Sequence, residues 1–224
     1  MSSQKVIHVF SDSHGEVFRF IQNRGFLTNT KIISYVVGGA TALGMVNPNS
    51  KTQALNKFKH KIAAIPKEHY LAFLLGEVDC GFVIWYRAEK YGEPVERQLN
   101  ESLRNYFTFL SALKRNGYNR LLVASAPLPT IEDGQNWGEV ANKRSEVKAS
   151  LRDRTELTFK YNEKLKQYCA ENGIMYVDTQ SATTDPDTGL VSKHFLNRNP
   201  FDHHLENGKI APVVYEELKK HGFE

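Results

Sequence analysis

Cysteine is scarce in this chain, which contains only Cys80 and Cys169. Two cysteines can form one disulfide at most, which is too few for a disulfide-stabilised fold. Their spacing resembles no metal-binding motif. We therefore expect two thiols buried as small apolar groups in a protein of a reducing compartment.

Long apolar runs are absent as well. No stretch of 18 apolar residues without a charge occurs, and the N-terminus has no charged region followed by an apolar one. A membrane-spanning helix and a secretory signal both lose support. We expect a cytoplasmic protein with no membrane partner.

The chain also lacks a strong excess of charge of either sign. Its 29 lysines and arginines stand against 25 aspartates and glutamates, and the resulting net charge of +4 is spread along the sequence. Such a mild balance predicts no nucleic-acid partner. The expected partner is instead a small molecule.

Length and composition are those of an ordinary globular protein. The 224 residues are 41% hydrophobic and 24% charged, which is enough to build a sizeable core. No internal repeat, low-complexity tract or linker interrupts the sequence. A single domain over residues 1–224 is expected.

Apolar runs alternate with helical patterns five times along the chain. The runs are continuous rather than alternating, which is typical of a parallel sheet covered by helices on both faces. We therefore predict an α/β fold, a three-layer α/β/α sandwich whose five-stranded parallel sheet has the flavodoxin-like order 2-1-3-4-5. The predicted strands are 6–10, 31–37, 70–75, 121–126 and 174–177, and the predicted helices are 17–23, 51–65, 97–116, 153–172 and 210–220. Residues 130–150 are expected to form a long loop or flap, and 179–203 a second loop.

Polar residues gather where the predicted strands end. In an open parallel sheet the ligand crevice lies outside these carboxyl ends, so residues distant in sequence converge there. The candidates for the site are Asp12, Ser13 and His14 after the first strand, Gly38 and Gly39 after the second, Glu77 and Asp79 after the third, and Asp202, His203 and His204 before the last helix.

Ser13 lies at a predicted strand-to-helix turn. A serine there can attack an acyl carbon when a histidine accepts its proton and donors receive the oxyanion. Asp202 would orient the histidine, and glycine amides such as that of Gly38 would approach the oxyanion closely. The alternative is that Ser13 and Asp202 only cap helices, with two surface histidines beside Asp202.

The spacing within the last motif separates the two histidines. Asp202 and His204 are two residues apart, so in an extended loop their side chains leave on the same side. This predicts a hydrogen bond between carboxylate and imidazole. His203 would point away, although it stays a rival base.

At these residues the chain resembles the SGNH (GDSL-like) hydrolases over its whole length. Ser11-Asp12-Ser13 is similar to the Gly-Asp-Ser block, Gly38 to the oxyanion glycine, and His204-Leu205 to the end of the Asp-x-x-His block. The third block, Gly-x-Asn-Asp, has Val78 in place of its asparagine, and the acid precedes His204 by two residues rather than three. The resemblance implies ester hydrolysis or acyl transfer, often on acetylated carbohydrate or lipid, without a metal or cofactor.

Two rival readings stay open. Ser11 to Gly15 also resembles the Asp-x-His metal block of calcineurin-like metallophosphoesterases, whose later Gly-Asn-His and Gly-His-x-His motifs the chain lacks. The second alternative is a non-catalytic, carbohydrate-binding protein with the SGNH fold. Val78 and the shortened Asp-x-His motif favour it. Trp85, Tyr86, Arg87 and Tyr91 could line a sugar pocket or pack under the loop.

Overall fold

The sheet at the centre of the molecule contains five parallel strands in the order β2-β1-β3-β4-β5. The computed structural model describes residues 4–134 and 147–224. This sheet confirms the predicted fold class and strand order. The strands are β1 (Lys5–Ser11), β2 (Thr30–Val36), β3 (Tyr70–Leu74), β4 (Leu121–Ala124) and β5 (Met175–Val177).

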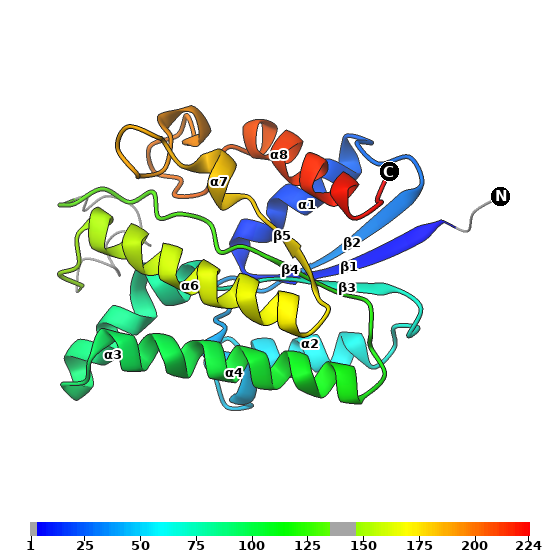
Figure 1. The fold of residues 1–224 in the computed structure, drawn as a ribbon, viewed down its shortest axis with the longest axis horizontal. Helices are drawn as coiled ribbons and strands as arrows, with labels where there is room; N and C mark the ends of the chain where they lie inside the picture. The colour runs from blue at the N-terminus through cyan, green and yellow to red at the C-terminus, as the bar shows by residue number, and fades with distance from the viewer. Residues whose placement is uncertain (1–3, 135–146) are drawn as a thin grey trace.

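Helices cover both faces of the sheet (Figure 1). One face carries α1 (Glu16–Asn23) and α8 (Asn207–Lys220), which contact each other. The other carries α2 (Ala54–Ile62), α4 (Val95–Arg115) and α6 (Leu151–Glu171). Each face has its own buried apolar cluster, so the sandwich has two cores with the sheet between them.

The amphipathic patterns read from the sequence locate these helices well. The apolar stripe of α1 buries Val17, Phe18 and Ile21. The stripe of α4 buries Leu99, Leu103, Tyr106, Leu110 and Leu113, among others. Helix ends differ from the predicted ones by a few residues only.

The sequence pattern did not predict the helix that lies between the third strand and α4. Helix α3 (Ile84–Tyr91) follows a π-helical turn, Asp79–Val83, directly after β3. Its side chains pack on their surroundings, since the Trp85 indole N–H donates to the Cys80 carbonyl and Arg87 pairs with Glu101 on α4. Glycines near this segment and its short length hid the helical period.

The two predicted loops have different outcomes. The loop 179–203 contains the short helix α7 (Gln180–Thr183) and a 3-10 turn at Lys193–Phe195. Of the expected loop 130–150, the described residues 130–134 and 147–150 are neither helix nor strand. Its middle lies outside the described residues.

The cysteines and the helix lengths bear on two expectations from the sequence. Cys80 and Cys169 are both buried and free, as expected. Among the described residues, no helix is both long and apolar enough to cross a membrane.

A buried histidine in β1 makes the fold sensitive to acid. His8 is 6% exposed, and its ring nitrogens lie 3.0 Å from His69 Nδ1 and 3.3 Å from the Tyr35 hydroxyl. Burial, helped by the nearby His69 and Lys31, lowers the pKa of His8 from 6.5 to about 4. The folded state therefore holds this ring neutral where the unfolded chain is already protonated.

We expect the free energy of unfolding to fall as the pH drops from about 6.5 to 4, because the unfolded chain binds a proton there and the folded protein does not. His8 should account for about 1–3 kcal/mol of that loss. Denaturant unfolding at several pH values checks it. His8→Gln should flatten the curve in this range, whereas exposed His60→Gln should not; equal curves for all three proteins would contradict the prediction.

Candidate active site

The register of the sheet brings the ends of three strands together. Ser11, the last residue of β1, pairs with Val36 of β2 and Leu74 of β3. Just beyond this register the Asp12 N–H donates to the Leu74 carbonyl and the Val37 N–H to the Ser11 carbonyl, so the residues that follow the three strands leave the sheet at the same end. The predicted convergence of these strand ends is thus what the topology produces.

Ser13 begins a 3-10 turn, Ser13–Gly15, between β1 and α1. The turn is capped by Asp12, whose Oδ1 accepts the His14 amide at 2.8 Å. Ser13 therefore does not serve as the helix cap that the alternative reading assigned to it. A Cβ on Gly15 would lie 1.8 Å from Ser11 Oγ, so this tight turn requires glycine at that position.

Asp202 and His204 form an acid–histidine pair in the loop before α8. His204 Nδ1 lies 2.6 Å from Asp202 Oδ1, which also accepts the His204 amide at 3.0 Å. Burial raises the pKa of Asp202, but the His204 amide and ring outweigh it and lower that pKa overall. The aspartate is thus held ionised beside the ring, as the two-residue spacing predicted.

The other ring nitrogen of His204 is the unusual one. Nε2 is buried and has no hydrogen-bond partner among the described residues. Helix α8 begins five residues after Asp202 and has no side-chain cap, so the alternative of Asp202 as a helix cap is wrong. The pair instead leaves one imidazole nitrogen available for a proton.

His203 does not point away as expected. Its ring centroid lies 4.1 Å from that of His204 and 5.4 Å from that of His14. The Thr130 hydroxyl donates to the His203 carbonyl at 2.6 Å, which ties this loop to the chain after β4. The short loop folds back on itself, so adjacent side chains do not take opposite sides as they would in a strand.

Ser13 and His204 line the same cavity, which has a volume of about 190 Å³. Its polar wall also includes His14, Asn197 and Asp202. Its apolar wall comes from β3, α1, α8 and the loop before α8, through Leu74, Val17, Ile210, Val214 and Leu205. A small hollow with one nucleophile and one acid–histidine pair is a suitable place for chemistry on a small group.

His14 lies beside this pair and has carboxylates of its own. Its Nδ1 is 3.1 Å from Asp12 Oδ1 and 3.8 Å from Glu77 Oε2, and its side chain is 5% exposed. Its ring centroid is 4.6 Å from that of His204. The predicted site residues Asp12, His14 and Glu77 are therefore brought together with the histidine pair.

Asp79 has a different place from the one predicted for a substrate-binding acid. It is fully buried, and its oxygens accept the amides of Ala42 and Leu43 at 2.8 and 2.9 Å and the Ser102 hydroxyl at 2.7 Å. Burial raises the pKa of this carboxyl despite those bonds. Asp79 holds the loop that follows Gly38 and Gly39 rather than facing the cavity.

The two glycines after β2 have free amides. Among the described residues, no hydrogen bond is formed by the Gly38 or Gly39 N–H, while Ala40, directly after them, donates to the Val37 carbonyl. Gly39 has a φ of 71°, which favours glycine. The Gly38 amide, which follows β2 at the carboxyl end of the sheet, is thus available to a ligand.

Sequence reasoning missed one residue that supports the pair. Asn197 Nδ2 donates to Asp202 Oδ2 at 3.0 Å, which fixes the second oxygen of the orienting carboxylate. The segment Leu196-Asn197-Arg198-Asn199 offers two asparagines, and nothing in their pattern separates this one from its neighbour.

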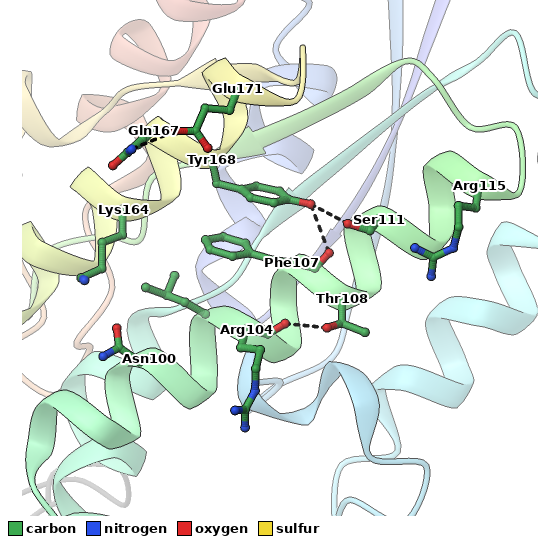
Figure 2. A pocket seen from close by; sticks show the side chains of 11 residues that line it. Asn100, Arg104, Phe107, Thr108, Ser111, Arg115, Lys164, Gln167, Tyr168 and Glu171 are labelled. Carbon is green, nitrogen blue, oxygen red and sulfur yellow. Dashed lines mark hydrogen bonds between the residues drawn. The ribbon is translucent and has the colours of Figure 1, made fainter.

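A larger hollow of about 590 Å³ lies elsewhere, between α4 and α6 (Figure 2). Phe107 and Tyr168 stack there with centroids 3.9 Å apart, and the Tyr168 hydroxyl lies 2.8 Å from Ser111 Oγ. No histidine or cysteine lines it. Ser13 and the Asp202–His204 pair line the smaller cavity at the strand ends.

No profile of a known protein family matches the chain, and no curated protein matches it in sequence. Solved structures do match. A Bacteroides fragilis protein described provisionally as an acylhydrolase has 15% identity and a TM-score of 0.61, covering 97% of this chain and 86% of its own. A GDSL-like lipase from Bacteroides thetaiotaomicron has 14% identity and a TM-score of 0.58 (97% and 87% covered). An acetyl xylan esterase has 12% identity and a TM-score of 0.56 (96% and 98% covered).

At such identities the likeness concerns the fold. It is the fold of the GDSL-like hydrolases, and it extends over nearly the whole chain. The fold implied by the SGNH resemblance is thus confirmed. The rival metallophosphoesterase interpretation gains nothing from these neighbours.

Proposed function

We propose that the chain is an SGNH-type serine esterase or O-acyltransferase that acts on an acylated, chiefly acetylated, carbohydrate or a similar small ester. The observation that carries this proposal is the state of His204. Its Nδ1 is held by Asp202, and its Nε2 is buried without a partner in the wall of a cavity that Ser13 also lines. This is the arrangement a base needs beside a nucleophile.

The mechanism follows from these positions. Ser13 Oγ attacks the acyl carbon while its proton passes to His204 Nε2, and the Asp202 carboxylate stabilises the imidazolium. Expulsion of the alcohol, which takes the proton from His204, leaves an acyl group on Ser13. Water or a sugar hydroxyl then gives its proton to His204 and attacks the acyl carbon, and His204 passes that proton to Ser13 Oγ as the acyl group leaves the serine.

Backbone amides would receive the oxyanion. The Ser13 N–H lies at the start of a helical turn, and the Gly38 N–H, just after the neighbouring strand β2, has no acceptor in the part of the chain that the structure describes. Val78 supplies no side-chain donor where the family pattern has asparagine. Because one oxyanion donor is worth roughly 10²- to 10³-fold in rate, we expect a slower enzyme than one with all three.

The size of the cavity favours a small acyl group. Its volume of about 190 Å³ is below the roughly 300–1,000 Å³ of sites for drug-sized ligands. An acetyl group fits such a space, and a long acyl chain does not. The fold neighbours include an acetyl xylan esterase, which supports an acetylated sugar as the first substrate to test.

A serine-directed fluorophosphonate probe tests the nucleophile directly. We expect the native chain to be labelled and Ser13→Ala to lose the label, because a phosphonate bonds only to an activated hydroxyl. Ser181→Ala, which removes an exposed serine of α7, is the matched control and should label normally. Labelling that persists in Ser13→Ala would exclude Ser13, and a native chain that resists the probe yet binds acetylated oligosaccharide would indicate the binding protein.

A further inference from the structure

Three histidines meet beside the proposed site, and two of them, His14 and His204, line its cavity. One ring nitrogen from each of His14, His203 and His204 lies within 4.8 Å of one from each of the other two. They come from distant parts of the chain, His14 from the turn after β1 and the other two from the loop before α8. Imidazole is a common ligand of zinc and of other divalent transition ions.

We propose that His14, His203 and His204 form a binding site for Zn²⁺, and that the bound ion inhibits the ester chemistry proposed above. The first part rests on the geometry of the cluster alone. The second rests on the proposed function, because it requires His204 to be the base.

The carboxylates around the cluster support the binding part. Nδ1 of His204 lies 2.6 Å from Asp202 Oδ1, and Nδ1 of His14 lies 3.1 Å from Asp12 Oδ1. Metal-bound histidines usually donate their second ring N–H to a carboxylate in this way, which orients the ring and raises its basicity. Two of the three rings therefore already have the carboxylate partner that metal-bound histidines usually have.

The buried Nε2 atom of His204 is a second, independent observation. It has lost its contact with water and has no partner among the described residues, an arrangement that costs free energy. A metal ion would satisfy it. Glu77, 2% exposed and 3.8 Å from His14 Nδ1, adds a third carboxylate whose charge attracts a divalent cation.

The cluster needs only a small movement to close on an ion. Tetrahedral Zn²⁺ with Zn–N bonds of about 2.0–2.1 Å places its ligand atoms about 3.3 Å apart. The nitrogens are at most 4.8 Å apart, so no two of them must move closer together by more than about 1.5 Å. The loop that carries two of the rings is half-buried, which permits such an adjustment.

Inhibition follows from the use of one atom for two purposes. A lone pair of His204 Nε2 that binds Zn²⁺ cannot accept the proton of Ser13. Occupation of the site therefore removes the base while it leaves the fold intact.

Isothermal titration calorimetry of the full chain with zinc chloride tests the binding. We expect one Zn²⁺ per chain. His203→Ala should lower the affinity by at least about 10-fold, and Asp202→Asn, which removes an orienting partner, by about 10- to 100-fold. His60→Ala, which removes an exposed histidine of α2, should bind as the native chain does. Equal affinity in native and His203→Ala proteins would overturn the site.

His14→Gln provides a second variant in case His203→Ala unfolds. Thermal unfolding with and without Zn²⁺ should show a rise in Tm for the native chain that is lost in His14→Gln, because only an ion bound to the folded state stabilises it. A rise of the same size in both proteins would contradict the proposal.

Initial rates on p-nitrophenyl acetate test the inhibition. The native rate should fall with added Zn²⁺ and recover with EDTA, and His203→Ala should need at least about 10-fold more Zn²⁺ for half-inhibition of its own metal-free rate. A rate that rises with Zn²⁺ would overturn the inhibitory role. Calorimetry decides the binding even for a chain without esterase activity, so failure of the site and failure of the proposed function are read separately.

Discussion

Ser13→Ala should lower kcat on p-nitrophenyl acetate by about 10⁴- to 10⁶-fold, one of the two largest effects that we expect. Loss of the nucleophile removes the acyl-enzyme route as a whole, and only substrate binding and the oxyanion donors remain to assist direct attack by water. The Ser13 carbonyl accepts the Glu16 amide within the turn, which alanine preserves, and the Ser13 hydroxyl forms no hydrogen bond with the described residues, so the loss should concern chemistry and not folding. Stopped-flow rates and a thermal melt of both proteins measure the two effects.

The control for this change is again the exposed Ser181. Ser181→Ala should retain the native rate, which shows that the assay reports on the strand-end site. All rates are measured with EDTA present, so that the proposed inhibitory ion does not mask activity. A native rate abolished by the chelator and restored by manganese would contradict the serine mechanism and favour the phosphoesterase.

The sequence predicts the fold because its apolar runs and helical stripes agree with each other. The apolar run from Val6 to Phe10 predicts a buried strand, and the turn after it places Ser13 at the carboxyl end of that strand. The parallel order then brings the chain ends that follow the strands to the same end of the sheet without any knowledge of side chains. The spacing of Asp202 and His204 likewise predicts their hydrogen bond, since it depends on local backbone geometry alone.

Other features depend on tertiary packing that the sequence does not display. His203 turns toward His14 because the loop folds back and is tied to Thr130. Asp79 faces the loop after β2 rather than the cavity, because the π-helical turn that contains it directs its carboxylate to the Ala42 and Leu43 amides. Asn197 is selected over Asn199 only by its position beside Asp202.

The two histidines of the last motif should respond very differently to substitution. His204→Ala should lower kcat by about 10⁶-fold, because no other group takes the proton of Ser13, and Asp202→Asn by about 10⁴-fold, because the ring loses its orientation and its counter-charge. His203→Ala should cost only about 10- to 100-fold, the effect of a base whose neighbour no longer packs against it. Kinetics of the three variants on one ester, with EDTA present, measure this order.

The pH dependence of each variant tests whether His204 acts as the base. If His204 is the base, the acid limb of the native kcat/KM profile should persist in His203→Ala, since the group that accepts the proton of Ser13 is still there. It should vanish in His204→Ala, whose residual rate does not use that group. His203→Ala as the inactive variant, with His204→Ala working normally, would transfer the role of base to His203. In that case the 2.6 Å bond between Asp202 and His204 would support the loop rather than the reaction.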